Sequence, residues 1–243
     1  MNLTASEKYA LKAYTWNFPL LGEVGYKGFF DFKKGEKEAA VLKNKNYDVE
    51  YAPVSAWSTL GWFRDPIFSG MLRRNEGQLA ELIIHEMTHA TIYLKSSVDF
   101  NENLASAVGE TGAEKFLAFK YGVASKELET YLHEQEDYNR FAKHMLEGTR
   151  QLDSLYHSME SKPDLEKEKL KTEMISSIVV SLDTISFFNS RYKTRFNNET
   201  LPGNAYFLSF VRYDAQKEEM KKELNGKFGG AIKSYLSSLE NGR

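Results

Sequence analysis

The chain has 243 residues, of which 42% are hydrophobic and 14% aromatic, so it can bury a substantial core as one domain. Its 32 basic and 34 acidic residues give a formal charge of -2, which provides no electrostatic footprint for nucleic acid or for an anionic membrane. Because there is no cysteine, disulfides and thiolate ligands are excluded, and any bound metal must be held by His, Asp or Glu.

The sequence contains no candidate transmembrane segment. No apolar run approaches the roughly 20 residues that cross a bilayer. Residues 1–10 lack the basic-then-apolar order of a signal peptide. We therefore expect a soluble chain with a single domain over residues 1–243, and the oligomeric state stays open.

Residues 1–74 predict a small β-sheet. Residues 25–32 and 47–54 are aromatic and β-branched with partial alternation, and a short charged helical stretch separates them at residues 34–45. Since the remaining sequence is mostly helical, we expect an α+β fold.

Residues 75–122 predict two consecutive helices. Asn75 can cap the first helix, and Gln78 three positions later completes a capping-box pattern. Apolar side chains then recur at helical spacing, at Leu79, Leu82, Ile83, Ala90 and Tyr93. After a turn, the second helix is expected over residues 101–121.

Residues 125–193 predict an antiparallel helical hairpin. Apolar side chains recur with a period of about 3.5 residues, and a proline-containing segment at residues 161–164 interrupts them. The second half of the hairpin is marked by Met174, Ile178, Ile185, Phe188 and Tyr192. A C-terminal helical segment is expected over residues 200–243.

The sequence His-Glu-Met-Thr-His at residues 85–89 predicts a metal site on the first of these helices. Four residues advance about 40° beyond a full helical turn, so His85 and His89 share a face and can hold one ion. Glu86 lies at the rim of that face, where its carboxylate can take a proton from metal-bound water. The alternative is a pair of buried, hydrogen-bonded histidines between two helices.

A catalytic zinc usually takes three protein ligands, so another His, Asp or Glu is expected nearby. We favour Glu102, which begins the next helix and would return toward the histidines. Its alternative role is to partner Asp99 in a helix N-cap. Glu110 and Glu114 are rival ligands on the same helix, and Glu110 could instead orient a histidine.

The pairing of HExxH with NExxA, at residues 85–89 and 101–105, resembles the gluzincin class of zinc peptidases, in which a downstream glutamate is the third ligand. A more specific resemblance is to the predicted bacterial aminopeptidase family, a gluzincin-like group. Four segments carry it and together span most of the chain, at residues 17–32, 51–72, 100–117 and 203–213.

This resemblance implies a zincin-like fold, a peptide substrate and one zinc ion bound by three side chains. The implied ligands are His85, His89 and Glu102, and Glu86 is the implied catalytic base. A tyrosine commonly stabilises the oxyanion in this class. Tyr213 is our candidate, although it could simply pack.

An aminopeptidase must also capture a free α-amino group with carboxylates. Asp65, Asp99 and Glu110 are available, and nothing in their spacing selects among them. Residues 51–57, which precede the metal-site helix, could hold a peptide by strand addition. Family members often carry a lipoprotein-type export signal at the N-terminus, so the resemblance leaves localisation open, with an exported or lipid-anchored envelope location as one alternative.

Two functions other than a zinc peptidase are alternatives for this sequence. Residues 86–89 also form a Glu-x-x-His pair, but a di-iron bundle needs a second such pair, which the sequence lacks. A non-hydrolytic zinc-binding or interaction protein would keep the histidines for structure, and it would have no need of Glu86.

Overall fold

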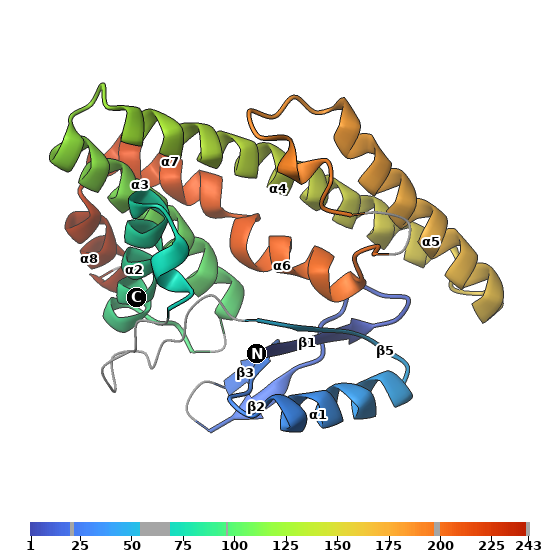
Figure 1. The fold of residues 1–243 in the computed structure, drawn as a ribbon. Coiled ribbons are helices and arrows are strands. Elements are labelled where there is room, and N and C mark those ends of the chain that lie inside the picture. The colour runs from blue at the N-terminus through green and yellow to red at the C-terminus, as the bar shows by residue number, and fades with distance from the viewer. Residues whose placement is uncertain (20–21, 54–68, 96, 197–199, 242–243) are drawn as a thin grey trace. The chain divides into compact units, whose positions relative to one another are not determined.

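The computed structural model describes residues 1–19, 22–53, 69–95, 97–196 and 200–241 (Figure 1). Its contacts divide the chain into two compact units. Unit 1 comprises Met1–Pro53 and Glu136–Val211, and unit 2 comprises Val54–Gln135 and Arg212–Arg243. The single domain expected from the sequence stays a prediction, and each unit is described by itself.

Unit 1 contains the small antiparallel sheet. Strand β1 (Asn2–Glu7) pairs with β4 (Lys27–Gly28) on one side and with β5 (Tyr47–Ala52) on the other. Helix α1 (Phe32–Asn44) packs on this sheet through a core of Leu3, Ala5, Ala39 and Leu42 (Figure 1). The expected N-terminal sheet and short helix are confirmed, whereas β1 and the β2–β3 hairpin (Trp16–Phe18 and Gly22–Val24) were not predicted.

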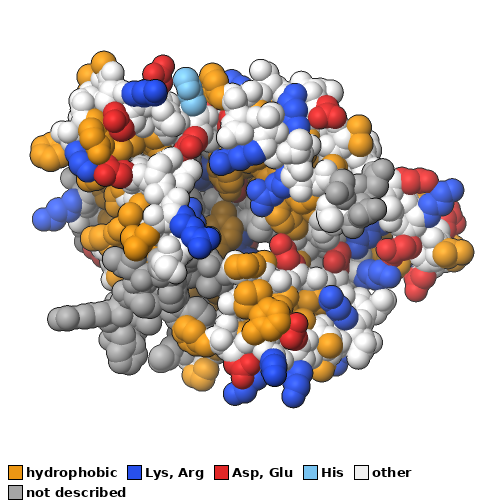
Figure 2. All heavy atoms as spheres, in the orientation of Figure 1, with side chains coloured by type: hydrophobic (Ala, Val, Ile, Leu, Met, Phe, Trp, Pro, Cys, Tyr) orange, Lys and Arg blue, Asp and Glu red, His pale blue; other side chains and the backbone are white. Residues whose placement is uncertain are grey.

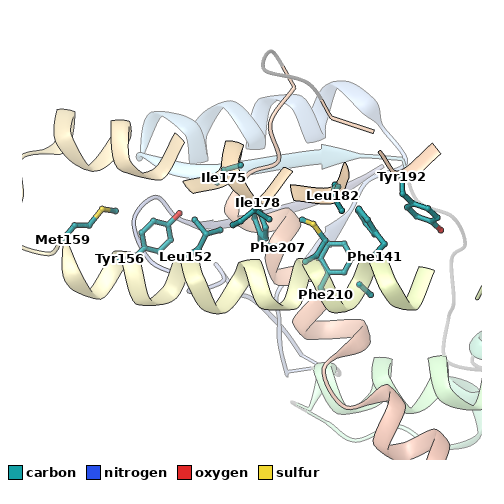
Figure 3. Close-up of a cluster of buried hydrophobic side chains, with 12 residues drawn as sticks. Phe141, Leu152, Tyr156, Met159, Ile175, Ile178, Leu182, Tyr192, Phe207 and Phe210 are labelled. Carbon is teal, nitrogen blue, oxygen red and sulfur yellow. The ribbon is translucent and has the colours of Figure 1, made fainter. Parts of the chain in front are cut away.

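The helical core of unit 1 lies between α4 (Lys126–Ser158), α5 (Asp164–Val180) and α6 (Asn204–Asp214). Figure 3 shows the α4 side chains in a row from Phe141 to Met159, with side chains of α5 and α6 packed along it. The predicted interruption at residues 161–164 is confirmed, because α4 ends at Ser158 and Pro163 precedes the first residue of α5.

The second half of the expected hairpin is shorter than predicted. Helix α5 ends at Val180, and only two short 3-10 helices follow, at Ser181–Thr184 and Ser190–Tyr192. The buried carboxylate of Asp137 on α4 accepts hydrogen bonds from the backbone N–H groups of Phe188 and Asn189, at 2.8 and 2.7 Å. These bonds replace the helical ones, so the apolar period of residues 185–192 marks packing against α4 without a helix.

Unit 2 consists of helices around a separate core. These are α2 (Glu76–Thr91), α3 (Val98–Tyr121), α7 (Lys217–Phe228) and α8 (Ile232–Asn241), with the start of α4. Asn75 caps α2 as predicted, because its side chain accepts a bond from the Gln78 backbone at 2.9 Å. The reciprocal half of the capping box is absent, since the Gln78 amide donates to Glu134.

The surface agrees with the near-neutral composition. On the face drawn in Figure 2, basic and acidic side chains are interspersed. Within the described residues, no helix has the length and the apolar character needed to cross a bilayer.

Candidate metal centre

Two glycines of α3 allow it to pack closely against α2. A Cβ added at Gly109 would stand 2.9 Å from the backbone oxygen of Glu81 and 3.4 Å from the Cβ of His85. A Cβ at Gly112 would stand 2.6 Å from the Cδ1 of Ile84. The lack of side chains at these positions therefore brings the backbone of α3 next to the helix that carries the histidines.

The two histidines face each other on α2. Their Nε2 atoms are 3.1 Å apart, and their rings meet edge to face with centroids 4.8 Å apart. His89 is buried and His85 is nearly so. The predicted helical geometry is confirmed, because residues four apart lie one above the other.

Glu102 of α3 completes the cluster. Its Oε2 atom lies 3.1 Å from the Nε2 of His85 and 3.3 Å from the Nε2 of His89. Each of the three residues offers one ligand atom, and these atoms all lie within 4.8 Å of one another. The structure thus brings together three predicted ligands in a group that could hold a metal ion.

The electrostatics of the cluster favour an ionised carboxylate. Burial alone would raise the pKa of Glu102, but hydrogen bonds from His85 and His89 outweigh it and lower the pKa to about 2. Burial likewise opposes a charge on His85, but the hydrogen bond to Glu102 wins and raises the pKa of His85. The carboxylate of Glu102 is therefore ionised within its pair with His85, and its oxygen is an acceptor that an entering cation could use.

The turn before α3 explains how the Glu102 side chain is directed toward His85 and His89. Helix α3 begins at Val98, so Asp99 lies inside its first turn and the alternative of an N-cap at Asp99 is wrong. The side chain of Asn101 accepts a bond from the Leu94 N–H at 2.8 Å and donates one to the Leu94 carbonyl at 2.7 Å. These bonds fix the chain that leaves α2 against the residue preceding Glu102.

Glu110 and Glu114 do not join the cluster. Glu110 receives Lys217 on one carboxylate oxygen at 2.8 Å and Lys221 on the other at 2.9 Å. Glu114 also contacts Lys221, at 2.7 Å. Neither belongs to the group that could hold a metal ion. Both oxygens of Glu110 contact lysines, and a role of Glu110 in orienting a histidine stays a prediction.

Glu81 is a partly buried carboxylate next to the metal-site residues of α2, and sequence reasoning missed it. It accepts hydrogen bonds from the Tyr131 hydroxyl at 2.8 Å and from the Gln135 amide at 2.7 Å. Burial first, and then the charge of Glu110, raises the pKa of Glu81. Its position one helical turn before His85 was the available signal, because residues four apart share a face.

Other predicted residues lie outside the cluster. Glu86 is half-buried on α2, and its charge contributes to the raised pKa of His85. Tyr213 is half-buried on α6, and Asp99 is exposed. Asp65 and residues 54–57 of the expected substrate strand lie outside the described residues, and Tyr51 belongs to β5 of unit 1.

Comparison with known families agrees with this geometry. A family model described as "Putative aminopeptidase" matches residues 1–241. The chain belongs to this aminopeptidase family. No curated protein and no solved structure matches the chain. The name of the aminopeptidase family points to peptide hydrolysis, for which a buried group able to hold a metal ion is a suitable centre.

Proposed function

We propose that the protein is a zinc-dependent aminopeptidase with a zincin-like, gluzincin-type metal site. The single observation that carries the proposal is the spacing of the three ligand atoms. Zinc bonds of about 2.0–2.1 Å in a tetrahedron hold ligand atoms roughly 3.3–3.4 Å apart. Here the three separations are 3.1, 3.1 and 3.3 Å, so a small ion fits among His85, His89 and Glu102 after minor adjustment.

The donor set also suits zinc. Two imidazole nitrogens and one carboxylate oxygen form a ligand set used by catalytic zinc, and three protein ligands leave a fourth position for water. The burial of Glu102, whose side chain is 8% exposed, also supports the proposal, because its carboxylate oxygen is held away from water and directly beside the two imidazole nitrogens. Zinc bound there would lower the pKa of its water and polarise the substrate carbonyl.

Side chains of this protein would then transfer the protons and bind the substrate. Glu86 accepts the proton of the attacking water and returns it to the leaving amine. Tyr213 donates a hydrogen bond to the developing oxyanion. Glu110 is poorly suited to bind the substrate amine, because both of its carboxylate oxygens contact lysines. Asp65 and Asp99 are the other candidates.

The test compares wild type with Glu86→Gln in two assays, metal content after zinc loading and hydrolysis of a panel of aminoacyl fluorophores. The expected result is that Glu86→Gln keeps one zinc and loses activity by about 100- to 10,000-fold. Glu76→Gln is the matched control, because Glu76 lies on the same helix but contacts Lys120 and Tyr121. It should keep both properties.

Three outcomes would contradict the proposal. If the wild-type protein binds no zinc, the proposed metal centre is wrong. If the Glu86→Gln variant keeps zinc and full activity, the assignment of Glu86 as the base is wrong. A wild type that binds zinc and hydrolyses no peptide would favour the non-hydrolytic zinc-binding alternative.

A further inference from the structure

Asn103 is a fully buried polar residue adjacent to Glu102 on α3. Its amide nitrogen donates to the carbonyl of Arg212 at 2.7 Å and to the carbonyl of Asp99 at 2.8 Å. Its amide oxygen accepts a bond from the backbone N–H of Gln216 at 2.7 Å. The side chain therefore holds both ends of residues 212–216, the corner at which α6 ends and α7 follows.

The corner is fixed to α3 a second time. Lys217, whose side chain is 2% exposed, contacts Asp214 of the corner at 2.9 Å and Glu110 of α3 at 2.8 Å. Asn103 and Glu110 are seven residues apart, so they lie on the same face of α3 at a separation of roughly 10 Å along the helix. Two anchors along one face determine both the position and the orientation of the corner.

Tyr213 lies between the two backbone groups that Asn103 holds. The corner is bonded to Asn103, the residue directly after the proposed ligand Glu102. Consecutive Cα atoms are only about 3.8 Å apart, so the corner is attached to α3 next to Glu102. The hydrogen bonds to Asn103 thus hold the backbone on both sides of a half-buried tyrosine against the helix that carries Glu102.

We propose that Asn103 is a positioning residue that acts through the corner of residues 212–216 and directs Tyr213 toward the metal centre, where its hydroxyl would donate to the developing oxyanion. The proposal rests on the proposed peptidase function and adds to it a link between the ligand helix and the oxyanion donor. We assign Asn103 to positioning rather than to holding the ion, because three hydrogen bonds of its side chain join backbone groups of residues 99, 212 and 216.

The first test measures proximity without catalysis. The protein is labelled with 3-fluorotyrosine, and the fluorine resonance of Tyr213 is assigned by its absence in Tyr213→Phe. The Tyr213 resonance should shift on addition of Zn²⁺. The resonance of Tyr121 is the internal control, because it lies 19 residues beyond Glu102 on α3, roughly 28 Å away along the axis, and should stay in place. A Tyr213 resonance that ignores Zn²⁺ overturns the proposal, whatever the activity of the enzyme.

The second test uses Asn103→Asp, which has the same shape but loses both donated hydrogen bonds. The variant should bind zinc with wild-type affinity, keep its KM and lose kcat by about 10- to 100-fold, because small displacements of a reacting group have effects of this size. In this variant the Tyr213 resonance should no longer respond to Zn²⁺ as in wild type. Asn103→Ser, which keeps a donor, should recover part of kcat, and it replaces Asn103→Asp if that variant does not fold.

A double variant separates positioning from general stability. If Asn103 acts through Tyr213, Asn103→Asp combined with Tyr213→Phe should be no slower than the slower single variant. Additive losses, or a loss of zinc affinity in Asn103→Asp alone, would overturn the proposal. Failure of the peptidase proposal is distinguished by the fluorine measurement, which needs zinc binding and no substrate.

Discussion

Asn101 and Leu94 are joined by two hydrogen bonds, one donated in each direction, across the turn between α2 and α3. The pair closes a small ring between the side-chain amide of Asn101 and the two backbone polar groups of Leu94. Glu102 follows directly, so the ring determines where the third ligand begins its approach to His85 and His89.

We expect Asn101→Asp to weaken zinc binding by about 10- to 100-fold, the range typical of groups that orient metal ligands. The substitution keeps the acceptor for the Leu94 N–H but places a carboxylate against the Leu94 carbonyl. The measurement is a competition titration with a chelating zinc indicator. Ser97→Ala is the control in the same turn, because the Ser97 side chain makes no capping bond. Equal zinc affinity of Asn101→Asp and wild type would show that the ring does not aim Glu102.

The metal-free protein should show a pH window of added stability from the contact between His85 and Glu102. The pKa of Glu102 is lowered from 4.5 to about 2 on folding, so its contribution is present above pH 4.5 and is lost toward pH 2. The pKa of His85 is raised from 6.5, so its contribution is complete below pH 6.5 and is lost as the pH rises through the raised value. The melting temperature of wild type, minus that of Glu102→Gln, should therefore be largest between pH 4.5 and 6.5, by several degrees. Parallel pH profiles of the two proteins would contradict this.

Gly109→Ala should separate α2 from α3. The new Cβ meets a backbone oxygen that cannot move without its helix, which makes overpacking of about 1–3 kcal/mol the larger effect, even against the gain of about 1 kcal/mol in helix propensity. Gly112→Ala is the matched control, because its Cβ meets the end of the Ile84 side chain, which can rotate. Urea unfolding should show the larger loss for Gly109→Ala, together with weaker zinc binding. Equal losses would mean that the backbone contact is not limiting.

Lys217→Met should be strongly destabilising. It removes the cation between the buried carboxylates of Glu110 and Asp214, a type of change that costs about 3–5 kcal/mol. Lys227→Met is the control, because the pair of Lys227 with Glu223 is exposed and contributes little to stability. The free energies of unfolding from urea titration give both values. A small loss at position 217 would show that Lys221 alone neutralises Glu110.

The parts of the site that the sequence could predict depend on local spacing. His85 and His89 lie four residues apart in a helix, and Asn75 caps that helix, so short-range rules were sufficient. Glu102 was found because a zinc site with two histidines requires a third ligand. The sheet was recognised from its aromatic strands, but β1 was missed, because the sequence of Asn2–Glu7 carries little hydrophobic pattern and is a strand through its two neighbours.

The parts that the sequence could not predict depend on partners far along the chain. The role of Glu110 is determined by Lys217 and Lys221, more than 100 residues later, and that of Asn103 by Arg212 and Gln216. Side-chain amides have no characteristic spacing in sequence, so Asn103 was not distinguishable from a surface residue. The shortened α5 has the same origin, because the bonds of Asp137 to residues 188 and 189 become visible only after folding.

The three consecutive side chains of Asn101, Glu102 and Asn103 divide different tasks within one helical turn, and this constrains how the protein can evolve. Loss of Glu86 would remove the proton acceptor that we propose and leave this turn unchanged, so a catalytically inactive descendant of the chain could keep its architecture and the group of His85, His89 and Glu102 that could hold an ion. Substitution of Asn101 or Asn103 would remove hydrogen bonds that hold α3 to its neighbours, and it would also displace side chains of the proposed active site. Inactive paralogues should therefore be recognised by changes on α2 rather than at residues 101–103 of α3.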